Sequence, residues 1–123
     1  MDEPVDLARA LATFDEPFAP RIVGHYNDNK LQVAKVLGEF VWHSHPETDD
    51  LFYVVSGYLT IQLRDRDVEL GPGELFVVPR GVEHRPLSPE GAEILLIEPL
   101  GTPNTGDSGV EPQPEVELGH DQA

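Results

Sequence analysis

Apolar residues between positions 18 and 100 fall into short stretches rich in Val, Ile, Leu and aromatic residues, and turn-forming residues separate these stretches. Short stretches with turn signals about every 8–12 residues predict the strands of an all-β sandwich or closed barrel. The polar clusters at 27–29 and 65–67 are typical of turns. The expected strands cover residues 20–26, 30–37, 38–45, 51–57, 58–64, 68–70, 74–79 and 92–100.

The two ends of the chain follow other patterns. Helical spacing of apolar residues behind Asp2 and Pro4 predicts one short helix within residues 1–17, and its apolar positions are Val5, Ala8, Leu11 and Ala12. Residues 102–123 are acidic and contain no Lys or Arg. Such a segment buries too little apolar surface to offset the entropy of ordering. We therefore expect a barrel over residues 18–101 and an acidic tail over 102–123, with a flexible distal part from about Gly109.

Composition narrows the possible functions. A chain of 123 residues is long enough for one domain with a single core. It has no cysteine, which excludes disulfides, thiol nucleophiles and zinc ribbons. Its formal net charge of -15 repels polyanions, so nucleic acid is not an expected partner. No apolar run approaches the ~20 residues of a membrane span and no basic leader is visible, so a cytoplasmic location is expected and a membrane partner is not.

Two histidine-bearing segments carry the candidate chemistry. His43 and His45 are one residue apart on an expected apolar strand, where side chains at i and i+2 point to the same face. A third histidine, His84, follows a strand and the turn formed by Pro79 and Gly81. Three imidazoles and a nearby carboxylate suit a divalent metal ion. The alternative is that these histidines are hydrogen-bonded residues of the barrel interior that need no metal.

These segments resemble the two motifs of the cupin superfamily, G-x(5)-HxH-x(3,4)-E-x(6)-G and G-x(5)-PxGxxH-x(3)-N, over residues 30–99. The first motif is matched by His43, His45, Asp50 and Gly57, with Gly38 one place closer than the pattern requires, and the second by Gly73, Pro79, Gly81 and His84. Two positions depart from the family, because Asp50 stands where Glu is usual and Ser88 where Asn is common.

The resemblance implies an all-β fold of the cupin type, a double-stranded β-helix or jelly-roll barrel, behind the short N-terminal helix. It also implies one divalent metal ion per chain, Fe, Mn, Ni or Zn, with His43, His45, Asp50 and His84 as ligands. Since Asp is one methylene shorter than Glu, Asp50 either binds the metal or holds a histidine ligand. Glu47 and Asp49 are neighbouring carboxylates with less suitable spacing. Cupins often form homodimers by exchanging N-terminal strands, and we expect a homodimer here.

Several other residues receive weaker interpretations. His25 is expected at the surface or an interface, and Trp42 in core or dimer packing. Arg80 and Arg85 flank the second motif as solvated charges or carboxylate-binding groups, and Glu98 ends an apolar strand where it can face inward. His120 is expected to be a solvated residue of the tail.

The family resemblance leaves the reaction open, since one fold supports many activities. The first hypothesis is a metal-dependent oxygenase, isomerase or lyase that acts on a small polar molecule. The second is a non-catalytic cupin that binds or senses a metal or small ligand. An isomerase needs a base near the metal, and Lys35 or Glu39 could serve if either points inward.

Overall fold

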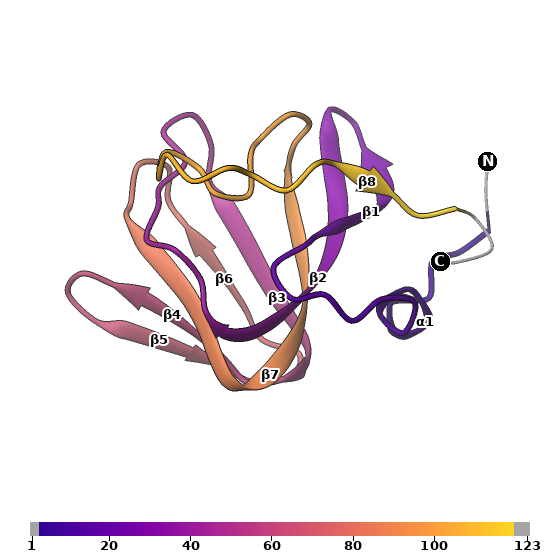
Figure 1. Ribbon diagram of the computed structural model, residues 1–123, viewed down its shortest axis with the longest axis horizontal. Helices are drawn as coiled ribbons and strands as arrows, with labels where there is room; N and C mark the ends of the chain where they lie inside the picture. The colour runs from indigo at the N-terminus through magenta and orange to yellow at the C-terminus, as the bar shows by residue number, and fades with distance from the viewer. Residues whose placement is uncertain (1–2, 120–123) are drawn as a thin grey trace.

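The computed structural model describes residues 3–119, and this part of the chain forms one short helix and eight strands (Figure 1). The all-β prediction with a single N-terminal helix is confirmed. The elements are α1 (Leu7–Leu11), β1 (Arg21–Tyr26), β2 (Asn29–Glu39), β3 (Asp50–Gly57), β4 (Leu59–Leu63), β5 (Asp67–Leu70), β6 (Leu75–Val78), β7 (His84–Pro99) and β8 (Val116–Glu117).

The strands form a curved sheet in the order β5-β4-β7-β2-β1-β8, and β3 pairs with both β7 and β6. The pairing does not close into a complete ring. Apart from the parallel pair of β1 and β8, neighbouring strands are antiparallel. Asn27, at φ 55°, turns the chain from β1 into β2, as the polar cluster there predicts.

Strand β7 has 16 residues and is longer than the sequence predicts, because it begins at His84 and not near residue 92. Its first part pairs with β4 and its second part with β3, while β2 lies beside both parts. Gly91, at φ 103°, marks the bend between the two parts. The prolines of residues 84–91 argue against a strand in sequence reasoning, yet Pro86 still accepts a hydrogen bond through its carbonyl from the N–H of Phe40.

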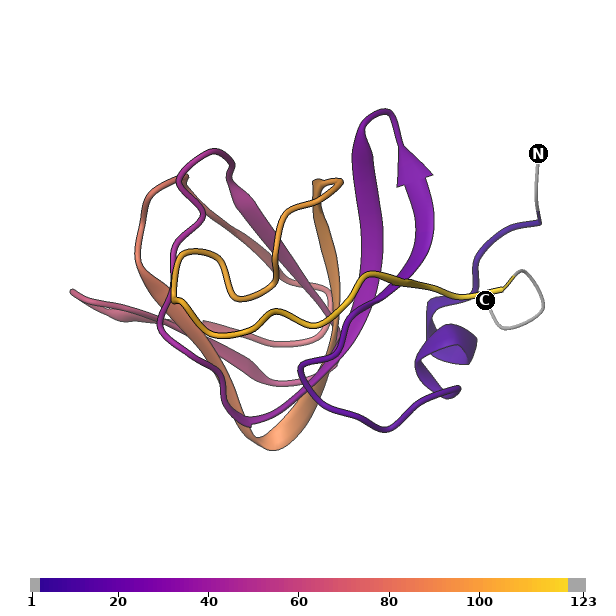
Figure 2. The same cartoon turned by 45° about the horizontal axis from the view of Figure 1, so that its top comes forward.

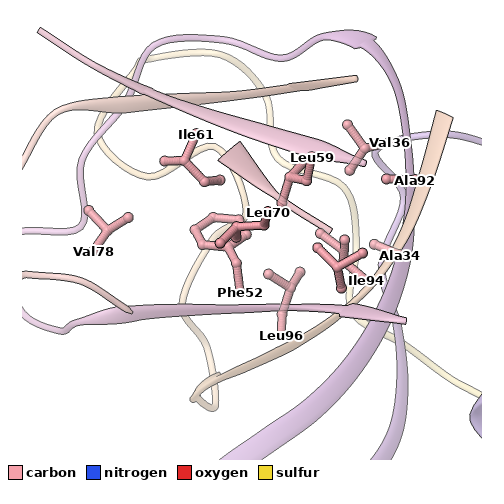
Figure 3. Packing of buried hydrophobic residues seen from close by; sticks show 11 residues of the cluster. Ala34, Val36, Phe52, Leu59, Ile61, Leu70, Val78, Ala92, Ile94 and Leu96 are labelled. Atoms are coloured by element: carbon pink, nitrogen blue, oxygen red, sulfur yellow. The ribbon is translucent and has the colours of Figure 1, made fainter. Parts of the chain in front are cut away.

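The main core lies inside this curved sheet. Side chains from the central strands pack there around Phe52 and Leu96, as Figure 3 shows. The cluster comprises Ala34, Val36, Phe52, Val54, Leu59, Ile61, Leu70, Val78, Ala92, Ile94 and Leu96. One end of the barrel interior is therefore filled with apolar side chains, and the functional residues gather beyond them.

The helix lies outside the barrel (Figure 1). It begins later than Asp2 and Pro4 suggest, because Asp6 is its N-cap and accepts a hydrogen bond from the N–H of Arg9 at 3.1 Å. Ala10 and Leu11 pack against Val33 of β2 and form a second, smaller apolar cluster. No helix within residues 3–119 is long and apolar enough to cross a membrane.

The C-terminal segment runs across one end of the barrel and ends beside β1 (Figures 1 and 2). Residues 116–117 form β8 on β1, and the N–H of Leu118 donates to the carbonyl of Ile22 at 2.9 Å. Glu115 accepts a hydrogen bond from the buried Lys30 at 2.7 Å. Flexibility of the tail from about Gly109 stays a prediction, and these contacts favour a segment attached to the barrel. His120 lies outside the described residues.

Candidate metal centre

Four side chains converge at the end of the barrel interior. One ligand atom from each of His43, His45, Asp50 and His84 lies within 4.8 Å of the other three, and all four residues are buried. Asp50 begins β3 and His84 begins β7, whereas the two remaining histidines come from the connection between β2 and β3. The structure thus brings together all four residues that sequence reasoning selected as candidate ligands.

The histidine pair does not lie on a continuous strand, which corrects the prediction of a strand over residues 38–45. Strand β2 ends at Glu39, and His43 forms an isolated antiparallel bridge with His84. In this bridge the N–H of His43 donates to the carbonyl of His84 at 3.0 Å, and the reverse bond measures 2.9 Å. Gly38, at φ 81°, lies in the last part of β2, where its pairing with β7 shifts register.

Backbone carbonyls orient two of the imidazoles. Nδ1 of His43 donates to the carbonyl of Val41, and Nδ1 of His84 donates to that of Val82, both at 2.9 Å. With the proton held on Nδ1, a neutral imidazole presents the lone pair of Nε2. Nε2 of His84 lies 3.1 Å from Oδ2 of Asp50. Two such atoms share either a proton on Nε2 or a metal ion bound to both of them.

Asp50 is the centre of the cluster. Its Oδ2 lies 3.1 Å from Nε2 of both His45 and His84, and its Oδ1 is buried without a hydrogen-bond partner. Burial favours the neutral acid, but hydrogen bonds from the two histidines outweigh it and hold the pKa of Asp50 below its usual range. The donor set, with its unpartnered buried oxygen, therefore fits a divalent metal ion.

The histidines differ in their electrostatics. Burial and the neighbouring His84 lower the pKa of His43 to about 4, so this imidazole is neutral near pH 7. Burial also opposes protonation of His45, yet its hydrogen bond to Asp50 outweighs burial and raises the pKa. A neutral imidazole is the form that binds a metal ion, and any proton held on His45 competes with that ion.

A cavity opens beside the four residues. The centre of a water-sized sphere can move through about 50 Å³ of this cavity. A single water molecule needs about 10–15 Å³ by the same measure. The cavity therefore accommodates a ligand of a few heavy atoms. Its walls are mostly apolar, with polar groups at His43, His45, Asp50, Glu98 and Asn104 among the lining residues.

Glu98 faces inward, as its position at the end of an apolar strand suggests. It is 4% exposed, lines the cavity and lies opposite Lys30 on β2, with 3.6 Å between Oε1 and the ammonium Nζ. Burial and the nearby Asp50 raise the pKa of Glu98 to about 7, against the opposing effect of Lys30. The register of β3 on β7 pairs Leu51 with Ile97, and its continuation sets Asp50 across from Glu98.

The other candidate carboxylates point away from the cluster. Asp49 is exposed and accepts a hydrogen bond from the N–H of Arg80 at 2.9 Å, and Glu47 is exposed as well. Glu39 pairs with Arg85 at 2.8 Å and its side chain is 62% exposed. Neither Glu39 nor these two residues belongs to the cavity lining.

Of the remaining residues of interest, His25 and Trp42 lie outside the core, whereas Ser88 is buried. His25 is exposed and hydrogen-bonds to Glu117. Trp42 does not enter the core, because the guanidinium of Arg64 stacks 3.7 Å from its ring centroid and that of Arg85 lies 5.2 Å away. Ser88, which stands where the cupin motif has Asn, is 1% exposed and donates its hydroxyl hydrogen to the carbonyl of Tyr58 at 2.6 Å. It thereby ties the bend of β7 to the start of β4.

Sequence reasoning missed one contact of the candidate site. Asp107, in the segment expected to be an acidic tail, accepts hydrogen bonds from the N–H and the hydroxyl of Ser44 at 2.7 and 2.8 Å. These bonds hold the pKa of the Asp107 carboxyl below its usual range. Ser44 lies between the two histidines, so the contact supports the residues that carry them. No local sequence pattern predicts that Ser44 pairs with Asp107, because the two residues are 63 positions apart.

Comparison with known proteins agrees with the fold. A crystal structure of a cupin-2 domain containing protein from Shewanella frigidimarina is 40% identical, with a TM-score of 0.76 over 77% of this chain and 93% of that chain. Protein NMB1881 from Neisseria meningitidis is 32% identical, with a TM-score of 0.73 over 79% of this chain and 99% of that one. The uncharacterized protein YdbB of Bacillus subtilis is 34% identical over 64 residues, which are 51% of this chain and 57% of YdbB.

The match to YdbB thus spans less than two thirds of that protein's length, whereas the two structures are covered almost completely. The family model described as a cupin domain matches residues 31–98, which contain all four residues of the cluster and both histidine motifs. This chain therefore belongs to the cupin family.

Proposed function

We propose that this protein binds one divalent metal ion, Fe, Mn, Ni or Zn, through His43, His45, Asp50 and His84, and that it is a metal-dependent enzyme acting on a small polar molecule. The observation that carries the proposal is the convergence of one ligand atom from each of these four buried residues, together with an Oδ1 of Asp50 that is buried without a hydrogen-bond partner. A divalent ion held by three imidazoles and one carboxylate keeps one or two positions open and supplies Lewis-acid chemistry.

Glu98 favours proton transfer, the chemistry of an isomerase or lyase, over an oxygenase reaction. A general base must lie within reach of the substrate and have a pKa near the working pH. Glu98 meets the first condition by lining the same cavity as the cluster, and its raised pKa is consistent with the second. Lys35 also borders the cavity, but its ammonium pairs with Asp15 and Glu93, and Glu39 pairs with Arg85 outside it.

The charge of the cavity favours an uncharged ligand. Among the described lining residues Lys35 is the basic side chain other than histidine, and it is already paired with carboxylates. Lys30, behind Glu98, is shared between Glu98, Glu115 and the carbonyl of Thr102. A carboxylate on the ligand would lie near the carboxylate of Glu98, and apart from the metal ion no unpaired cation of the described lining residues would offset the repulsion. We therefore infer a substrate with hydroxyl or carbonyl oxygens.

A deuterium-exchange assay tests this function. Small α-hydroxycarbonyl compounds such as glycolaldehyde and dihydroxyacetone offer two oxygens to a metal ion and an acidic C–H bond. We expect the metal-loaded protein to exchange that hydrogen with D₂O, as followed by NMR, and Glu98→Gln to bind metal normally but exchange at least about 100-fold more slowly. Equal rates of deuterium exchange in wild type and Glu98→Gln would show that Glu98 does not act as the base.

A parallel oxygen-electrode measurement distinguishes the alternatives. Metal-dependent oxygen uptake with small phenols or acids, without deuterium exchange, would identify an oxygenase instead. Ligand-induced changes in the metal spectrum without exchange or uptake would favour the second candidate, a non-catalytic cupin that binds or senses a small ligand. The cytoplasmic location, and the absence of nucleic-acid and membrane partners, stay predictions from composition.

We also propose that the protein is a homodimer. The outer face of the sheet carries two apolar rows across β2, β7, β3 and β6, and neither row contains a charged side chain in a chain of net charge -15. Two copies can therefore approach through this face with the least repulsion. The rows are Leu31–Ile97–Leu51–Val77 and Val33–Leu95–Tyr53–Leu75, and α1 covers the second row at Val33.

Replacing Leu75, which is 57% exposed, with a charged residue should weaken that dimer without disturbing the core. We expect sedimentation equilibrium at micromolar concentration to give a dimer for wild type and a shift towards monomer for Leu75→Glu. The matched control is Leu37→Glu, since Leu37 is 56% exposed and lies outside the two rows. A wild-type monomer would refute the homodimer. In the single chain β1 pairs with its own β2, so strand exchange is not required.

A further inference from the structure

We propose that Asp107 is a positioning residue of the metal centre, and that the C-terminal loop 103–110 is an integral part of the site. This inference rests on the metal binding proposed above and extends the site beyond residues 31–98, where the cupin-domain match lies. Asp107 does not approach as a ligand. It acts through Ser44, the residue between His43 and His45.

Three hydrogen bonds join these two residues. The Asp107 carboxylate accepts from the N–H of Ser44 at 2.7 Å and from its hydroxyl at 2.8 Å, and the N–H of Asp107 donates to the carbonyl of Ser44 at 3.0 Å. Both backbone groups of Ser44 and its side chain are thus bonded to one residue. Since Ser44 is 7% exposed, losing these bonds would leave buried polar groups unpaired.

The neighbouring residues of the histidine segment are held from the opposite side. His43 exchanges two backbone hydrogen bonds with His84, and the carbonyl of His45 accepts one from the N–H of Gly81 at 3.0 Å. The second cupin motif therefore fixes the outer two residues, and Asp107 fixes the middle one. Rotation of either peptide plane next to Ser44 would turn His43 or His45 away from Asp50, so this third attachment adds to the contacts that hold the direction of both imidazoles.

The loop fits closely against the site. A Cβ atom added to Gly106 would lie 2.3 Å from the carbonyl oxygen of Ser44 and 2.9 Å from Cδ2 of His43, and the φ of Gly106 is +54°. Only glycine permits this approach without a shift of the backbone. The loop is itself braced, because the hydroxyl of the buried Thr105 donates to the carbonyl of Val110 at 2.8 Å. Asn104 of the same loop lines the cavity.

Cobalt binding by the full-length chain tests this role. We expect wild type to bind Co²⁺, and Asp107→Ala to lower the Co²⁺ affinity about 10–100-fold, the range typical of residues that orient metal ligands. The visible absorption of bound Co²⁺ should also change, because the histidines are reoriented. Asp107→Asn keeps one acceptor oxygen for Ser44 and should recover part of the affinity. Glu111→Ala, an exposed acidic residue of the same segment, is the charge-matched control and should behave as wild type.

The outcomes separate this inference from the proposed metal binding. If wild type binds no Co²⁺, the metal proposal fails and this inference falls with it. If wild type binds Co²⁺ and Asp107→Ala does so with unchanged affinity and spectrum, the positioning role is overturned while the metal site stands. Should Asp107→Ala fail to fold, Asp107→Asn decides, since lowered affinity with an altered spectrum supports the role and wild-type values overturn it.

Discussion

Replacing His84 with alanine is expected to remove stoichiometric binding of divalent metal, with an affinity loss of at least about 100-fold. The variant deletes one of the three buried imidazoles of the cluster, and it also removes a hydrogen-bond partner of Asp50. His43→Ala should have a similar effect, because a ring nitrogen of His43 belongs to the same convergent set. Metal content after dialysis, measured by plasma mass spectrometry, records both losses.

His25→Ala is the matched control for these substitutions. His25 is exposed and hydrogen-bonds to Glu117, far in sequence from either motif, so its loss should leave the metal content unchanged. Circular dichroism of the metal-free proteins checks that the variants fold. Full metal occupancy in a protein carrying both His43→Ala and His84→Ala would show that the ion binds elsewhere.

The largest expected effect on stability comes from Gly57→Ala. Gly57 ends β3 opposite Ala92, at φ +78°, and an added Cβ would lie 2.3 Å from the carbonyl oxygen of Gly91 and 2.9 Å from Cα of Ala92. Both contacts are with backbone, so the strand pair must separate where β7 bends. We expect a loss of about 3 kcal/mol or more in the free energy of unfolding, measured by urea denaturation of the metal-free protein.

Gly38→Ala separates the two causes of that loss. Gly38 has nearly the same φ, +81°, but an added Cβ would meet no atom within 4 Å. Its replacement should therefore cost only the left-handed backbone conformation, roughly 1–2 kcal/mol. Equal losses in the two variants would mean that the close approach of β3 to β7 contributes nothing, contrary to the packing described above.

The strands and the four candidate metal ligands could be predicted because short-range sequence patterns indicate both. Alternating apolar residues determine which face of β3 and β7 is buried, and the spacing of the two motifs selects His43, His45, Asp50 and His84. The bend of β7 could not be predicted in this way. Pro86 and Gly91 lower the strand propensity of residues 84–91, and the pairing with β4 and β2 overrides it.

The contribution of the C-terminal segment was also beyond local reasoning. Its composition predicts an acidic tail with a flexible distal part from about Gly109, and it does not indicate which acidic side chains have specific partners on the barrel. Asp107 bonds to Ser44, and Glu115 bonds to the buried Lys30. These contacts join residues 63 and 85 positions apart in the sequence, and such pairings become visible only when the fold brings the partners together.

Metal binding at the four candidate metal ligands can be tested most directly with a crystal structure of the protein loaded with a transition-metal ion, with diffraction data collected at the absorption edge of that ion. We expect one anomalous peak per chain, bound by Nε2 of His43, His45 and His84 and by the carboxylate of Asp50. A loaded crystal whose peak lies away from these four residues, or one in which they remain bonded to each other without an ion, would contradict this expectation.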